Sequence, residues 1–191
     1  MTTPKSPMGR VPKCPPDAHF PLFAGFITPG SDWDPPRPLD ASISMDIFDP
    51  TEKVSRRRYE RIRVVEIDDP FLIEVNWCVC GVFAAGLSGC WQLDFYLDDV
   101  DGVGASSGRL GTTQTVDVSS VKPVPDPTND DISKRCYTYQ YTVPANTVQV
   151  GAYSLLAVIT LRSGSCARPG PLEGDYLGHA QIPVVVFVPG E

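Results

Sequence analysis

The sequence predicts an all-β protein, an antiparallel sandwich of seven to eight strands preceded by a proline-rich, extended N-terminal arm. Hydrophobic and polar residues alternate with a period of two, which is the pattern of half-buried strands. Turn signals recur about every ten residues, as they do in sandwiches. The 191 residues include 16 Gly and 20 Pro, an excess that favours many short elements joined by turns.

Composition and charge limit the class of protein. The chain is 42% hydrophobic, with 16 Lys and Arg against 23 Asp and Glu, a formal net charge of −7. It can form a core, and its length favours one domain. Its acidity disfavours nucleic acid, because phosphate contacts need clustered Lys and Arg. No apolar stretch is long enough for a membrane span, and the N-terminus lacks the apolar core of a secretory signal. We therefore expect cytoplasmic synthesis, with the final location left open.

The arm, residues 1–40, contains ten prolines, which remove backbone donors and favour extended chain. It also carries apolar side chains, namely Phe20, Leu22, Phe23, Phe26, Ile27 and Trp33. Such an arm becomes ordered only by packing these side chains on its own domain or on a neighbouring subunit. The sandwich itself is expected over residues 41–191.

Eight segments carry the strand pattern. They are Ser42–Phe48, Arg61–Ile67, Phe71–Phe83, the segment that begins at Cys90, Thr112–Val118, Cys136–Val143, Gln149–Leu161 and Gln181–Val188. Asp-Pro pairs close the first two segments and mark turns. In the third, alternation places Trp77 and Val79 inward and Cys78 outward, and in the fourth it places Trp91 inward. Lys122–Asp131 and Ser163–Gly178 are expected to be loops.

The segment Val150-Gly-Ala-Tyr-Ser-Leu155 resembles the G-x-Y-x-C start of strand F in immunoglobulin-like sandwiches. The resemblance implies that the Tyr153 hydroxyl ties down the preceding corner. It also implies that the inter-sheet disulfide is absent, since Leu155 stands at the cysteine position. Trp91 follows Cys78 by 13 residues, close to the Cys-to-Trp spacing of strands B and C. The resemblance covers roughly residues 60–190 and implies a fold, not an activity.

The chain has six cysteines, Cys14, Cys78, Cys80, Cys90, Cys136 and Cys166. A Cys-x-Cys on a strand points both thiols to one face, and Cys90 returns opposite Cys80 if residues 81–89 join adjacent strands. Free, partly buried thiols are the preferred interpretation, because free Cys behaves as a small hydrophobe. Disulfides, and a metal or redox site on Cys78, Cys80 and Cys90, remain as alternatives.

Motifs for catalysis do not stand out. The chain has two histidines, His19 and His179, and the sequence contains no nucleophile elbow, P-loop or dinucleotide fingerprint. We therefore expect no catalytic residues and no cofactor.

The strongest functional signal is surplus apolar surface. An antiparallel sandwich normally wets its outer faces, yet the last two long strands are apolar on both faces. Their outer positions Leu156, Val158, Val185 and Phe187 need a cover, which is either the proline-rich arm folded back or another chain. In addition, the arginine-rich run that begins at Arg56 reads as a charged edge strand, with docking to an acidic partner or to nucleic acid as alternatives.

The leading hypothesis is a non-catalytic structural or adaptor domain that binds copies of itself or docks in a larger complex. Its expected contacts are Phe20, Phe23, Phe26, Trp33, Arg56, Arg57, Arg58, Leu156, Val158, Val185 and Phe187. A second hypothesis is a module that binds carbohydrate or another small ligand through loops at one end of the sandwich and aromatic side chains, with Tyr137, Tyr139, Tyr141, Trp33 and Tyr176 as candidates. Against it, Tyr137, Tyr139 and Tyr141 stand in the same register, as core residues do.

Overall fold

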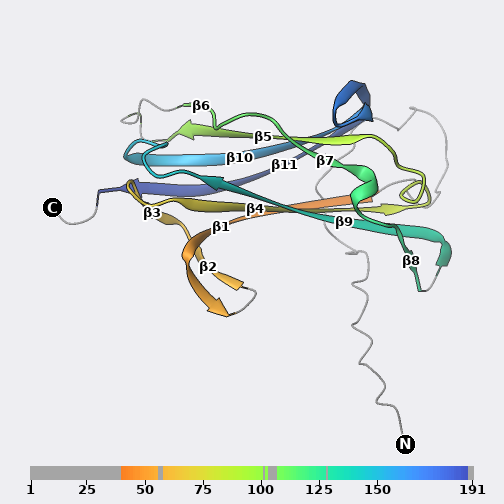
Figure 1. Ribbon diagram of the computed structural model, residues 1–191, viewed down its shortest axis with the longest axis horizontal. Helices are drawn as coiled ribbons and strands as arrows, with labels where there is room; N and C mark the ends of the chain where they lie inside the picture. The colour runs from red at the N-terminus through yellow and green to blue at the C-terminus, as the bar shows by residue number, and fades with distance from the viewer. Residues whose placement is uncertain (1–39, 56–57, 101, 103–106, 128, 189–191) are drawn as a thin grey trace, which may run out of the picture.

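The computed structural model describes residues 40–55, 58–100, 102, 107–127 and 129–188, which form two stacked β-sheets (Figure 1). Sheet A has the order β2 (Arg58–Ile62), β1 (Asp40–Ser55), β4 (Phe71–Gly81), β9 (Asn129–Val143) and β8 (Val124–Asp126). Sheet B has the order β3 (Val64–Glu66), β11 (Arg168–Phe187), β10 (Gly151–Ser165), β5 (Cys90–Asp99) and β6 (Gly108–Arg109), with β7 (Gln114–Asp117) also on β5. The strands within this part of the chain exceed the predicted seven to eight because five of them have only two to five residues.

The strand order confirms an immunoglobulin-like sandwich. In that fold one sheet has the order A-B-E-D and the other C-F-G. Here β1-β4-β9-β8 supplies the first order and β5-β10-β11 the second. Strand β3 pairs in parallel with β11, so the chain crosses from sheet A to sheet B between β2 and β3. At this crossing the outer part of β1 and β2 form a hairpin that leaves the body of the sandwich (Figure 1).

The predicted alternation on β4 and β5 is confirmed. Trp77 and Val79 on β4 and Trp91 on β5 are buried between the sheets. The Trp77 ring stacks on Tyr137 of β9 with centroids 5.0 Å apart, and the Trp91 ring meets Trp77 edge-on at 6.1 Å. These aromatic contacts join both sheets, because Trp91 belongs to sheet B and its two partners to sheet A. Offset and edge-on pairs of this kind add to the stability that burial alone provides.

Four predicted boundaries are wrong. The loop expected over Lys122–Asp131 contains β8 and the start of β9. The strand expected to reach Phe83 ends at Gly81, whose φ of 145° suits a glycine, and a turn follows. The single strand expected over 61–67 is split between β2 and β3. The loop expected over 163–178 is largely strand, since β11 begins at Arg168. Its Pro and Gly content indicated a loop, but an edge strand tolerates proline.

The preference for free thiols is also wrong. Cys78 and Cys136 are directly opposed on β4 and β9 and form a disulfide with Cα atoms 4.0 Å apart. A second disulfide joins Cys90 to Cys166, with Cα atoms 5.0 Å apart, and Cys80 is disulfide-bonded as well. Cys90 does not return opposite Cys80, because β5 lies in sheet B. Within the described ranges there is no free cysteine and no cluster of potential metal ligands.

The implied tyrosine corner is present only in part. Tyr153 is buried near the start of β10, which occupies the place of strand F. Its ring lies against Gly151, where an added Cβ would be 3.2 Å from the hydroxyl. That hydroxyl has no hydrogen-bond partner among the described residues, so it does not form the hydrogen bond to the corner.

Within the described residues, no helix is long and apolar enough to cross a membrane.

Candidate functional site

The predicted contact residues of sheet B are partly exposed. Val185 on β11 is 43% exposed, and Leu156, Val158 and Phe187 are half-buried. Arg58 lies on β2, the edge strand of sheet A, as predicted for the arginine-rich run. The other predicted contacts, Phe20, Phe23, Phe26, Trp33, Arg56 and Arg57, lie outside the described residues.

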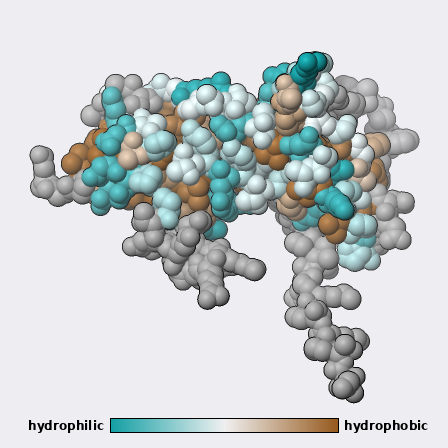
Figure 2. All heavy atoms as spheres, viewed as in Figure 1, coloured by the Kyte–Doolittle hydropathy of each residue, from teal (hydrophilic) through white to brown (hydrophobic). Residues whose placement is uncertain are grey.

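An apolar surface lies at the end of sheet B from which the C-terminus leaves. Val64 on β3 is paired with Val185 on β11, so their side chains share one face. Val64 is 55% exposed, and Val188, just beyond β11, is 53% exposed. We call Val64, Val185 and Val188 the end patch. Figure 2 shows hydrophobic residues gathered at this end of the body.

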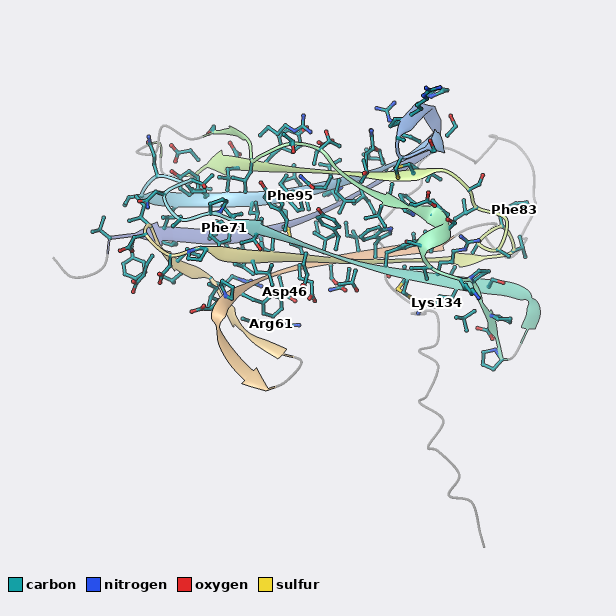
Figure 3. All side chains as sticks on the ribbon, in the orientation of Figure 1. Asp46, Arg61, Phe71, Phe83, Phe95 and Lys134 are labelled. Atoms are coloured by element: carbon teal, nitrogen blue, oxygen red, sulfur yellow. A yellow bond between two sulfur atoms is a disulfide. The ribbon has the colours of Figure 1, made fainter. Side chains whose placement is uncertain are left out.

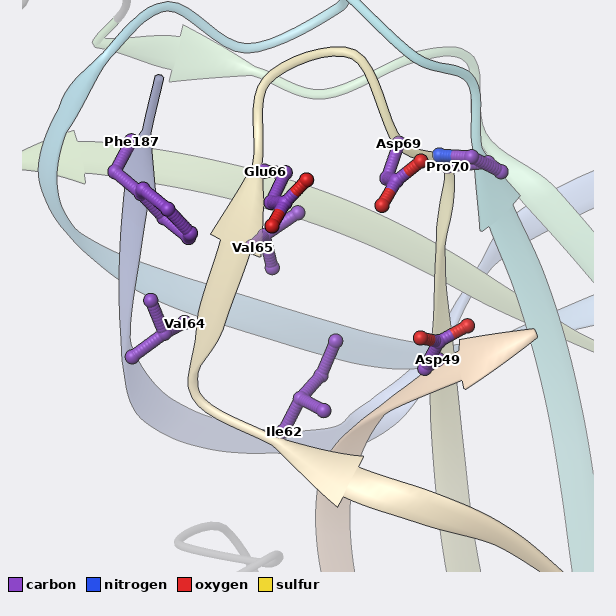
Figure 4. Close-up of a pocket in the computed structure, with 8 residues that line it drawn as sticks. All are labelled: Asp49, Ile62, Val64, Val65, Glu66, Asp69, Pro70 and Phe187. Carbon is purple, nitrogen blue, oxygen red and sulfur yellow. The ribbon is translucent and has the colours of Figure 1, made fainter. Parts of the chain in front are cut away.

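A pocket of about 240 Å³ adjoins the end patch and shares Val64 with it. Figure 4 shows the side chains that surround this end pocket, which come from β1, β2, β3, the turn before β4 and the end of β11. Its apolar lining consists of Ile62, Val64, Val65, Pro70 and Phe187. Three carboxylates, Asp49, Glu66 and Asp69, complete the wall. The pocket therefore suits an apolar group with positive charge near it.

The cationic side chains near the foot of the hairpin are held by an acidic neighbour. Arg61 and Arg63 donate to the two carboxylate oxygens of Asp46, at 3.0 and 3.2 Å. Asp46 is directly opposite Glu74 on β4, and like charges in that position repel. The two arginines offset this repulsion. These arginines therefore balance the negative charge of Asp46 and Glu74 in the same part of the molecule, a role that the sequence alone did not indicate.

The outer face of sheet A is a hydrogen-bonded polar layer. Asn76 donates to Glu74 at 3.0 Å, Thr138 donates to Asn76 at 2.6 Å, and Gln140 donates to Glu74 at 2.8 Å. These side chains satisfy one another across β4 and β9. The layer therefore fixes strand register and leaves few groups to recognise a ligand.

The opposite end of the sandwich carries an exposed aromatic side chain. Phe83 is 61% exposed in the turn that follows β4, and Figure 3 shows it at the extremity of the molecule. The amide of Ala84 donates to Gly81 at 3.2 Å, and that of Gly86 donates to the Phe83 carbonyl at 3.1 Å. Ala84 is buried in the core. The exposure of Phe83 is therefore a property of an ordered turn.

Arg135 supports this turn from below. It is a buried residue of β9 whose Nη2 donates to the Ala85 carbonyl at 2.7 Å and whose Nη1 donates to the Val118 carbonyl at 3.0 Å. A buried guanidinium needs such acceptors, because desolvation is costly without them. Arg135 thus joins the turn to the connection that follows β7.

The tyrosines proposed for ligand stacking belong to the interior. Tyr137 is buried against Trp77, and Tyr141 is half-buried and stacked on Phe95 at 5.2 Å. Tyr139, also half-buried, donates to Gln114 at 2.7 Å, a bond that crosses from sheet A to sheet B. Their shared register on β9 was the sequence signal for this outcome. Trp33 and the side chain of Tyr176 lie outside the described residues.

Sequence reasoning missed the end pocket and the exposed turn. The pocket brings residues 62–70 together with Asp49 and Phe187 from distant parts of the chain, so no local pattern predicts it. Phe83 follows an unbroken apolar run, and the only signal that it leaves the sheet is Gly81.

Comparison with known proteins adds a likeness of shape. No family model and no curated protein matches the sequence. Among solved structures, the CARDB domain of a Pyrococcus furiosus protein, in complex with di-metal ions, is similar with a TM-score of 0.41 and 13% identity, over 79% of this chain and 90% of that one. A β-glucosidase from Erythrobacter marinus is similar with a TM-score of 0.39 and 11% identity, over 77% of this chain and 16% of that one. We infer nothing about activity from likenesses of this size.

Proposed function

We propose that this β-sandwich is a non-catalytic structural domain that assembles with other copies of itself, either alone or within a larger complex. The observation that carries the proposal is the end patch, where Val64, Val185 and Val188 are each about half exposed on neighbouring segments. Clustered apolar surface of this kind marks a contact more often than scattered exposed residues do. Burying one valine side chain is worth about 1.5–3 kcal/mol when the burial is complete.

The end pocket extends this contact surface. Val64 belongs to both features, and Phe187 on the pocket wall is next to Val188. A flat patch continued into a pocket gives a partner both area and an anchoring point, the arrangement found at the centre of many interfaces. The arm, residues 1–40, stays in the proposal as a second contact.

We also propose that the folded domain works in an oxidising environment. Disulfides persist in such compartments and are rare in a reducing cytosol. Cys78–Cys136 and Cys90–Cys166 support this location, whatever route the chain takes from its site of synthesis. Mass-spectrometric mapping of protein purified from its natural source tests it, and thiols that label freely without reductant would contradict it.

Size-exclusion chromatography with light scattering over a wide concentration range tests the assembly function. We expect the full chain to associate, and Val185→Lys to shift the midpoint of association to higher concentration. Leu177→Lys is a matched control, since Leu177 is similarly exposed on β11 but pairs with Thr160 of β10, away from the end patch. A protein that stays monomeric at every concentration would refute self-assembly, and equal effects of the two variants would remove the end patch from it.

A further inference from the structure

We propose that copies of this domain bind head to tail, with Phe83 of one copy inserted into the end pocket of the next. The proposal rests on the assembly function above and specifies its geometry. It joins two features of the fold, an aromatic side chain exposed on a hydrogen-bonded turn at one end and a partly apolar pocket at the other.

The two features lie at opposite ends of the molecule. Pro70 lines the pocket, and β4 begins at the next residue and runs for 11 residues to Gly81, two positions before Phe83. A strand of that length spans about 35 Å. Phe83 therefore cannot reach the pocket of its own chain, and the contact has to be made between copies.

The sizes match. An enclosed apolar cavity of roughly 150 Å³ accommodates benzene, and the end pocket, which is partly open to solvent, has about 240 Å³. A phenyl ring fits with space for part of the turn. The ring would contact Ile62, Val65 and Phe187, all of which face the pocket (Figure 4).

The turn is prepared for insertion. Hydrogen bonds from Ala84 and Gly86, together with the Arg135 bond to Ala85, hold the turn in place while Phe83 remains exposed. A turn whose backbone is already held in place loses little freedom on association, so only the Phe83 side chain has to be ordered. An ordered anchor is therefore more effective than the same residue on a loose loop.

Charge favours the same orientation. The pocket wall carries Asp49, Glu66 and Asp69, whereas Lys134 on β9 lies at the Phe83 end (Figure 3). Contact between unlike ends brings these opposite charges together. Contact between like ends would bring carboxylates against carboxylates, which disfavours a symmetric dimer built on two pockets.

A contact between two different surfaces has a distinct consequence. It leaves one free Phe83 and one free pocket at the ends of every assembly, so growth continues unless the rotation closes a ring. The expected species are therefore a concentration-dependent series beyond the dimer.

Two one-sided variants test this arrangement. Phe83→Ser removes the inserted side chain and keeps the pocket, while Val64→Glu places a carboxylate in the pocket wall and keeps Phe83. Both sites are exposed, so circular dichroism and thermal unfolding should report intact folds. Each variant alone should associate roughly ten- to a hundredfold more weakly than the wild type. Leu177→Ser, at a similarly exposed position on β11, should leave association unchanged.

The decisive measurement is sedimentation velocity on a mixture of the two variants. We expect a 1:1 heterodimer that does not grow, because Phe83 of the Val64→Glu variant binds the intact pocket of the other. A mixture that remains monomeric, or Phe83→Ser assemblies as large as those of the wild type, would overturn the head-to-tail contact while leaving self-assembly standing. A wild type that is monomeric throughout would overturn both.

Discussion

Removing the Cys78–Cys136 disulfide tests the structure most directly. The two residues are 58 positions apart in the sequence, and cross-linking a loop of that length lowers the entropy of the unfolded chain by an amount equivalent to roughly 4 kcal/mol at 25 °C. Typical domains have about 5–15 kcal/mol of total stability. We expect Cys78→Ala/Cys136→Ala to lower the free energy of unfolding by most of the roughly 4 kcal/mol that the cross-link contributes, with a fall in Tm of roughly 8–16 °C.

This pair separates the cross-link from packing. Cys78 is half-buried and Cys136 exposed on the outer face of sheet A, so the alanine variant loses little packed volume. Urea unfolding followed by circular dichroism measures the difference, first without and then with a reductant. The difference should disappear when the wild type is reduced. A double variant within about 1 kcal/mol of the oxidised wild type, or a difference that persists in reductant, would refute the reasoning.

Two further variants test local geometry. Gly89 has a φ of 116°, and a Cβ there would lie 2.2 Å from the Arg162 carbonyl oxygen. Gly89→Ala should therefore lower the free energy of unfolding, measured in urea, by more than about 1 kcal/mol. Gly86→Ala, where an added Cβ has no contact under 3.8 Å, should be tolerated, and equal effects of the two substitutions would contradict the close approach. Burial, aided by the charge of Tyr141, raises the pKa of Tyr139 above its usual value. As the pH rises, the unfolded chain loses the Tyr139 hydroxyl proton before the folded chain does, so stability present below pH ~10 declines as the pH rises through the folded-state pKa. Tyr139→Phe should flatten this alkaline decline in the free energy of unfolding. An unchanged dependence of stability on pH would contradict the raised pKa of Tyr139.

The core was predictable because its signal is local. Alternation along β4 and β5 depends only on the pleat of each strand, so Trp77 and Trp91 could be assigned to the interior without knowing which strands pair. The same reasoning placed Tyr137 in register with its neighbours on β9. The structure confirms all three as buried.

The cysteine pairing was not predictable, because it depends on register between distant segments. Six cysteines allow fifteen connectivities, and Cys78 meets Cys136 only because β9 aligns with β4 in one particular way. Free thiols were preferred because an isolated cysteine commonly behaves as a small hydrophobe, and the sequence alone does not reveal how β9 aligns with β4. Phe83 escaped prediction for a related reason, since Gly81 alone ends the strand.

The position of the exposed apolar surface follows from the neighbours of each side chain. Leu156 lies between Tyr96 on β5 and Gln181 on β11, and long amphipathic side chains of this kind cover adjacent apolar surface while their polar ends reach water. Leu156 is consequently half-buried without any additional layer. Val185 has the small Ala152 on one side and Val64 on the other, so nothing of comparable length shields it. The partner contact that the sequence predicts for the whole outer face of sheet B is therefore proposed only for the end of this sheet, beside the pocket.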